Sequence, residues 1–160
     1  MLDEIQGSFL LQQIGSPLST PMAVKDCEHR FVYVNEAFAR IVGSSIQDLL
    51  GKHDLELGRP ENLVLGDPET GWPGLWQLDD QVLESGNHSR HIETGFDDRI
   101  NTETQRTPLR NDAGKVVGLL VQLHDVGEVR ELKRSVANNR EALWIQKGEA
   151  TTLDLSLIHI

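Results

Sequence analysis

Apolar and polar residues near the start of the chain alternate in a way that predicts a β-hairpin running directly into a short helix. Residues 22–25 (MAVK) form a short apolar strand, and residues 31–34 (FVYV) form a second one that is rich in β-branched and aromatic side chains. The polar residues 26–29 separate them as a turn. Asn35 follows at once, and asparagine caps helices by accepting an unpaired backbone N–H. The helical period that follows is apolar and ends at a glycine: Phe38, Ile41, Val42 and Gly43.

Helical spacing of apolar residues predicts three further helices in the first half of the chain. Residues 2–14 form an amphipathic pattern that glycine and prolines end before the first strand. Residues 44–50 follow Ser44 and Ser45, either of which suits the N-cap. Residues 75–85 have an apolar stripe and are followed by a glycine typical of a helix end: Leu75, Leu78, Val82, Leu83 and Gly86.

The remaining segments before residue 125 predict one irregular excursion and a set of strands. Residues 59–74 are rich in proline and glycine and have no clear period, so we expect an irregular loop. Trp72 and Trp76 lie near its end and are expected to hold it against the body of the domain. Three antiparallel strands are expected after the helix, at residues 91–96, 100–109 and 116–124.

A capping box at the end of the last strand predicts a long C-terminal helix. Asp125 suits the N-cap, and Glu128 lies three residues later, where its side chain reaches back to the cap. The helix is expected to continue to about residue 150. Two sets of residues repeat every seven positions: Val129, Val136, Leu143 and Ala150, and Leu132, Asn139, Gln146 and Leu153. This weak heptad pattern favours a coiled-coil rod; a solvated helix that covers the sheet is the alternative.

The order of these segments resembles the PAS family of sensory domains. The front half carries VKD, FVYVNEAF and LLGKHDLEL, which resemble the family's hairpin, cap and short helices. LWQLDDQVLESG (75–86) resembles the helix beside the family's pocket. INTETQRTPL (100–109), RNDAG (110–114) and VVGLLVQLHDV (116–126) resemble its last two strands and their turn. The resemblance covers about residues 9–133.

This resemblance implies an α+β PAS fold, with a five-stranded antiparallel sheet flanked by short helices, an N-terminal helix and a C-terminal signalling helix. It divides the chain into an amphipathic helix at 1–16, a PAS domain at 17–126, a signalling helix at 127–154 and a tail at 155–160. The tail, LSLIHI, resembles a translated sequencing adapter, which predicts that the natural chain continues beyond residue 154 into an output domain. An ordinary apolar strand is the alternative.

Composition narrows the class of protein. A length of 160 residues with 38% hydrophobic residues suits one domain with flanking helices. A formal net charge of −10 leaves no basic stripe to meet phosphates, which argues against nucleic-acid binding. Cys27 is the only cysteine, no apolar run is long enough to span a membrane, and the acidic N-terminus does not resemble a signal peptide. These features predict a cytoplasmic location.

Candidate chemistry is sparse along the sequence. It contains no G-x-S-x-G elbow, P-loop or H-E-x-x-H motif, so we expect no catalytic residue and no metal ligand. Cys27 lies in a turn and lacks the Asn-Cys-Arg-Phe run of flavin-binding light sensors. His88 and His91 lie outside the 75–85 helix, where haem-binding PAS domains carry their axial histidine. The sequence therefore argues against haem and flavin and leaves any cofactor unknown.

The resemblance implies that the inner face of the sheet and the 75–85 helix enclose a ligand pocket. The candidate lining residues are Phe38, Ile41, Leu78, Val82, Gln105, Leu119 and Val121. An ordinary hydrophobic core would need the same apolar stripe, so both interpretations remain open here. Asn35 is expected to be a structural cap, and Asp125 and Glu128 are expected to transmit the signal.

The expected function is that of a sensory module. The domain would bind a small ligand or a partner and transmit the signal through its C-terminal helix to an output domain, either a diguanylate cyclase or a histidine kinase. Residues 149–154 faintly resemble the start of a diguanylate cyclase domain. The resemblance also implies a homodimer formed through the N- and C-terminal helices. Two alternatives remain: a ligand-free dimerisation scaffold, and a small β-sheet enzyme with its site in the 59–74 loop.

Overall fold

The computed structural model describes residues 19–93, 102–126, 132, 134–143 and 145. The chain divides into two compact units, at residues 1–125 and 126–160. The elements of the first unit are β1 (Met22–Asp26), β2 (Phe31–Val34), α2 (Glu36–Val42), α3 (Ile46–Leu49), α4 (Glu61–Val64), α5 (Leu75–Ser85), β3 (Ser89–Glu93), β4 (Thr102–Arg110) and β5 (Val116–Asp125). They confirm the α+β class expected from the sequence.

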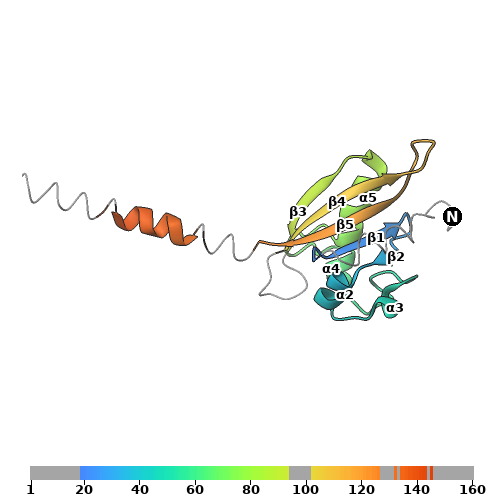
Figure 1. Ribbon diagram of the computed structural model, residues 1–160, viewed down its shortest axis with the longest axis horizontal. Coiled ribbons are helices and arrows are strands. Elements are labelled where there is room, and N and C mark those ends of the chain that lie inside the picture. Colours follow the sequence, from blue (N-terminus) through green and yellow to red (C-terminus); the bar gives the residue numbers. More distant parts are fainter. Residues whose placement is uncertain (1–18, 94–101, 127–131, 133, 144, 146–160) are drawn as a thin grey trace, which may run out of the picture. The chain divides into compact units, whose positions relative to one another are not determined.

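The five strands form one antiparallel sheet in the order β2-β1-β5-β4-β3. The long strands β4 and β5 pair along their whole length, and α5 packs against both of them (Figure 1). The hydrophobic core is formed by residues of the strands and of α2, α3 and α5: Ala23, Phe31, Val34, Phe38, Ala39, Leu49, Val82, Leu119, Val121 and Leu123. The core therefore lies between the sheet and the helices.

The hairpin and the first capped helix form as the local sequence predicts. Asn35 is only 2% exposed, and its Oδ1 accepts hydrogen bonds from the backbone N–H of Phe38 (2.9 Å) and of Met22 (3.0 Å). Its Nδ2 donates to the backbone oxygen of Thr20 (2.9 Å). Gly43 ends α2 in the left-handed conformation, with φ of 68°. Asn35 is therefore a cap that also joins the start of β1 to the start of α2.

Replacing Asn35 with alanine is expected to lower the free energy of unfolding by about 2 kcal/mol. The loss of a helix cap accounts for about 1 kcal/mol, and the loss of a hydrogen bond to the buried Met22 N–H adds a similar amount. Ser45 provides the matched control, because its side chain caps only α3 and lies at the surface. Urea unfolding should show a smaller loss for Ser45→Ala. Equal unfolding midpoints for Asn35→Ala and wild type would contradict the prediction.

Several element boundaries differ from those expected. Residues 59–74 were predicted to be irregular but include the short helix α4. The strand predicted at 91–96 already begins at Ser89, because Ser89 pairs with Arg106. Residues 94–101, which include the rest of that strand and the predicted start of the next, lie outside the described residues. The helix after Val42 begins at Ile46, which selects Ser45 over Ser44 as its cap.

The second unit contains a helix at residues 134–143, with 132 and 145 also helical. Its large apolar side chains are exposed: Leu132, Val136, Leu143 and Ile145. Glu128, the predicted helix at 2–14 and the tail at 155–160 lie outside the described residues. In the described part of the chain, no helix combines the length and the apolar character needed to cross a membrane.

Candidate functional site

A group of polar side chains, all of them buried except the partly buried Arg59, lies between the sheet and α5, and we call it the polar centre. It comprises Lys25 of β1, Asp54 and Arg59 of the α3–α4 connection, Asp79 of α5, Glu93 of β3, and Thr104 and Arg106 of β4. Buried charges are rare in proteins because leaving water is costly, so they require partners. The geometry of this group shows how each charge is compensated.

Lys25 is bound by two carboxylates. Its Nζ lies 2.8 Å from Oδ2 of Asp54 and 3.0 Å from Oδ2 of Asp79. The ammonium group also lies 5.0 Å from the centre of the Phe31 ring, within the range of a cation–π contact. Lys25 is directed inward because alternate residues of β1 face the core, and Ala23 occupies the previous inward position.

Arg106 connects α5 to the far edge of the sheet. Its Nε donates to Oδ1 of Asp79 (2.6 Å), and its Nη1 donates to Oε1 of Glu93 (2.7 Å). The other oxygen of Glu93 accepts a hydrogen bond from Oγ1 of Thr104 (2.8 Å). One continuous network of ion pairs therefore links β1, α5, β3 and β4 beneath the sheet.

Ion pairing outweighs the effect of burial on the pKa of three side chains of the network: Asp79, Lys25 and Arg106. Burial alone would raise the pKa of Asp79, but Lys25, His29 and Arg106 together hold this pKa well below its usual range. Burial likewise opposes the charge of Lys25, yet Asp54 and Asp79 raise its pKa above the ordinary value. The pKa of Arg106 is also raised, because Glu93 and Asp79 outweigh the effect of burial. Asp79, Lys25 and Arg106 are therefore charged at neutral pH.

An aromatic pair covers the polar centre next to the hairpin turn. The His29 ring stacks on Trp76, with the ring centres 4.7 Å apart and the planes 6° from parallel. Its Nε2 lies 3.1 Å from Oδ1 of Asp80, while Nδ1 is 3.5 Å from Oδ2 of Asp79, too far for a good hydrogen bond. His29 reaches this place from a left-handed backbone conformation, with φ of 64°. The turn between β1 and β2 is thereby joined to α5.

A small cavity borders the polar centre. Its volume is about 20 Å³, enough for one water molecule. The polar part of its lining is formed by residues of the polar centre: Lys25, Asp54, Asp79, Glu93, Thr104 and Arg106. The apolar part is formed by Phe31, Phe38, Leu75, Val121 and Leu123. A larger hollow of about 550 Å³ lies over the α4–α5 connection, beside Trp72. Trp72 holds that connection in place, since its indole N–H donates to the backbone oxygen of Leu63 (2.8 Å).

The structure brings only some of the predicted pocket residues to this cavity. Phe38 and Val121 line it. Three others are buried in the domain without lining the cavity: Leu78, Val82 and Leu119. Ile41 is 38% exposed, and Gln105 alternates with the inward Thr104 and Arg106, so it lies on the opposite face of the sheet. Which residues contact a ligand stays a prediction.

The sequence reasoning missed the charged residues of the site. Two signals were available in the sequence. Lys25 interrupts an apolar strand, and Asp79 lies within the apolar stripe of α5, between Leu78 and Val82.

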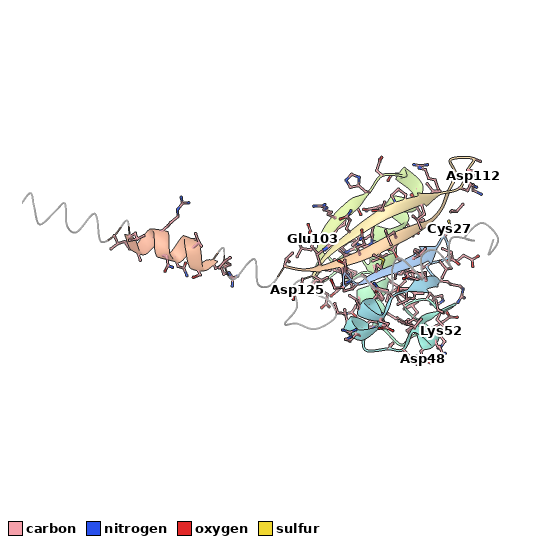
Figure 2. The ribbon with its side chains drawn as sticks, viewed as in Figure 1. Cys27, Asp48, Lys52, Glu103, Asp112 and Asp125 are labelled. Carbon is pink, nitrogen blue, oxygen red and sulfur yellow. The ribbon has the colours of Figure 1, made fainter. Side chains whose placement is uncertain are left out.

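In the described residues, no three histidine, cysteine or acidic side chains are grouped to hold a metal ion. Cys27 is exposed in the hairpin turn (Figure 2).

Comparisons with known proteins place this geometry in a family. The family model described as PAS fold matches residues 16–131. The structure of VqmA bound to DPO shares 26% identity with a TM-score of 0.55, covering 72% of this chain and 57% of that one. A sensor histidine kinase from Vibrio cholerae shares 20% identity with a TM-score of 0.53, covering 74% of this chain and 90% of that one.

An RNA-binding light-oxygen-voltage receptor shares 21% identity with a TM-score of 0.61, covering 84% of this chain and 37% of that one. The two structures below 25% identity support the fold alone. The chain spans 37% to 62% of the length of the first three structures that it matches. No curated protein matches the chain closely.

Proposed function

The chain belongs to the PAS fold family, and from this premise we propose that it is the sensory module of a larger cytoplasmic signalling protein. A small molecule held beside the polar centre changes the packing of the sheet, and β5 passes the change to the C-terminal helix. The observation that carries the proposal is the network of ion pairs, because it couples a cavity to four elements at once. VqmA, at 26% identity, is known from a structure with a bound small molecule, DPO.

The path to the output follows β5. Its residues Leu119, Val121 and Leu123 are buried, and Val121 and Leu123 line the cavity. The strand ends at Asp125, where the first unit ends (Figure 2). Asp125 would cap the following helix, as its spacing from Glu128 predicts. The output domain would be a diguanylate cyclase or a histidine kinase, and the solved relatives include sensor kinases.

Replacing Asp125 with alanine in the full-length protein is expected to leave ligand affinity nearly unchanged while abolishing the change in output on ligand addition. The cap fixes how the helix leaves the sheet, so its loss separates binding from transmission. The ligand is first identified by native mass spectrometry of freshly purified protein, and output is then measured with and without it. Asp112→Ala is the control, because Asp112 is an exposed aspartate in the β4–β5 turn (Figure 2). Equal fold-changes in the Asp125 variant and wild type would remove Asp125 from the path.

The helix of the second unit supports a homodimer. Val136 and Leu143 are seven residues apart, and both are more than half exposed, as is Leu132. Exposed apolar residues at heptad spacing are typical of a helix that pairs with a second copy. The N-terminal segment at 2–14 would contribute in the same way.

Replacing Val136 with lysine is expected to weaken dimerisation at least tenfold, because it places like charges opposite each other in the seam. Asn138→Lys is the matched control, since Asn138 is on the same helix but two positions away from the seam residue. Light scattering and native mass spectrometry over a concentration series measure the change. A wild-type chain that remains monomeric, or equal dimer stability in the two variants, would argue against the coiled coil.

One observation favours a second candidate function, a ligand-free dimerisation scaffold. The cavity of about 20 Å³ holds no more than a water molecule in this conformation, and ion pairs fill most of the space beside it. A scaffold of this kind would purify at the mass of the chain alone and would bind no added small molecule.

A further inference from the structure

The charges of the polar centre restrict what can be bound beside it. It pairs three basic with three acidic side chains: Lys25, Arg59, Arg106, Asp54, Asp79 and Glu93. Their formal charges cancel. A charged ligand entering this buried space would leave one charge without a partner, and an uncompensated buried charge is strongly unfavourable. The site therefore selects against both anions and cations.

The cavity is bordered by N–H donors that the hydrogen bonds among the described residues do not use. Each carboxylate oxygen of Asp54, Asp79 and Glu93 already lies within contact distance of a donor. An arginine side chain carries five N–H donors, and Arg106 uses two in hydrogen bonds to described residues, at Nε and Nη1. A lysine carries three, and Lys25 uses two of them within the same part of the chain. The polar side of the cavity thus offers N–H groups to an acceptor.

The other side of the cavity is apolar. Phe38 of α2 and Leu75 of α5 face it together with Phe31 and two residues of β5. A ligand larger than water needs more room, and the two sides differ in what it costs to move them. Shifting Phe38 or Leu75 to another rotamer exposes no charge, whereas separating the ion pairs does. Making room for a ligand therefore costs least among the apolar residues.

We propose that the ligand is a small uncharged molecule with a hydrogen-bond acceptor, such as a carbonyl oxygen or a ring nitrogen, bound to Arg106 and Lys25. Its apolar part packs against Phe38 and Leu75. This assignment rests on the proposed sensory function, since it defines the ligand class of the same site. It adds that recognition depends on the neutral state of the ligand as well as on its shape.

Two sets of molecules with nearly identical shape and different charge test this proposal on the whole chain. The first is benzamide, benzoate and benzamidinium, and the second is acetamide, acetate and acetamidinium. Binding is followed by the NMR signal of the Arg106 Nε–H and by thermal unfolding. The expected result is that at least one amide shifts the signal and raises the unfolding temperature, with at least tenfold higher affinity than its anion and its cation.

A pair of variants tests whether Arg106 is the residue that binds the amide. Arg106→Lys keeps the charge but removes the guanidinium donors, and it is expected to weaken amide binding at least tenfold. Arg110→Lys, in the same strand but at the surface, should leave binding unchanged. If Arg106→Lys does not fold, the comparison of the charged and uncharged molecules on wild type decides alone.

Equal or tighter binding of an anion or a cation would overturn the proposal, as would an Arg106 signal that none of the six molecules shifts. These outcomes are distinguishable from failure of the sensory function. Dimer mass and the effect of Asp125→Ala on output are measured separately, with the ligand that native mass spectrometry identifies.

Discussion

Replacing Asp79 with alanine is expected to destabilise the domain by about 3–5 kcal/mol, the range for breaking a buried ion pair by removing one partner. Asp79 is fully buried, and its two oxygens bind Lys25 (3.0 Å) and Arg106 (2.6 Å). Without it, each cation keeps only part of its compensation in the buried interior of the domain. The loss is a large fraction of the stability of a typical domain, so the variant should unfold at a much lower urea concentration than wild type.

Asp80 provides the control for this variant, because it is the next residue of α5 and its side chain is half exposed. Its Oδ1 lies 3.1 Å from Nε2 of His29. Exposed pairs of this kind contribute at most about 1 kcal/mol, so Asp80→Ala should unfold near the wild-type urea concentration. Similar midpoints for Asp79→Ala and Asp80→Ala would show that the polar centre contributes little to stability.

The same residue sets the response of the domain to acid. The pKa of Asp79 in the folded state lies below its ordinary value of 3.8, so its stabilisation is present above that value and is lost as the pH falls through the folded pKa. Lys25 acts in the opposite direction: its pKa is raised above 10.5, so its stabilisation is present below 10.5 and is lost as the pH rises through the folded pKa. Stability measured against pH should therefore fall at both ends, and Asp79→Asn should flatten the acid side.

Local signals in the sequence were enough to predict much of the fold. The hairpin, the cap at Asn35 and the bounds of α5 each depend on residues close together in the chain. A strand that leads into an asparagine cap needs only neighbouring residues to specify it. The five-stranded sheet was predicted from the order of the segments and from their resemblance to a known family.

The polar centre could not be predicted in this way, because its contacts join distant parts of the chain. Lys25 is 29 residues from Asp54 and 54 from Asp79, and Asp79 is 27 from Arg106. The register of β4 determined which of its polar side chains face the polar centre. A shift of one residue exchanges the faces of a strand, so Gln105 was expected inside where Thr104 and Arg106 lie. No periodicity in the sequence distinguishes these two registers, since all the residues concerned are polar.

Replacing Gly74 with alanine is expected to destabilise the domain by about 3 kcal/mol and to disturb the cavity at the same time. Gly74 has φ of 93°, a conformation that costs other residues about 1–3 kcal/mol. A Cβ atom there would also lie 2.5 Å from the backbone nitrogen of Gly66 and 2.6 Å from the backbone carbon of Leu65. Backbone atoms do not move aside easily in a packed structure, so the α4–α5 connection would have to separate.

The matched control is Gly58→Ala, which has a similar positive φ of 75° but no atom within 4 Å of the added Cβ. It should show only the conformational cost of about 1 kcal/mol. The difference between the two variants in urea unfolding isolates the close backbone contact. Gly74 immediately precedes Leu75, which lines the cavity, and Asp79 follows one turn later on α5. Gly74→Ala should therefore also weaken the binding of any ligand of the cavity, whereas Gly58→Ala should not. Equal unfolding and equal binding in the two variants would show that the close backbone contact between Gly66 and Gly74 does not position α5.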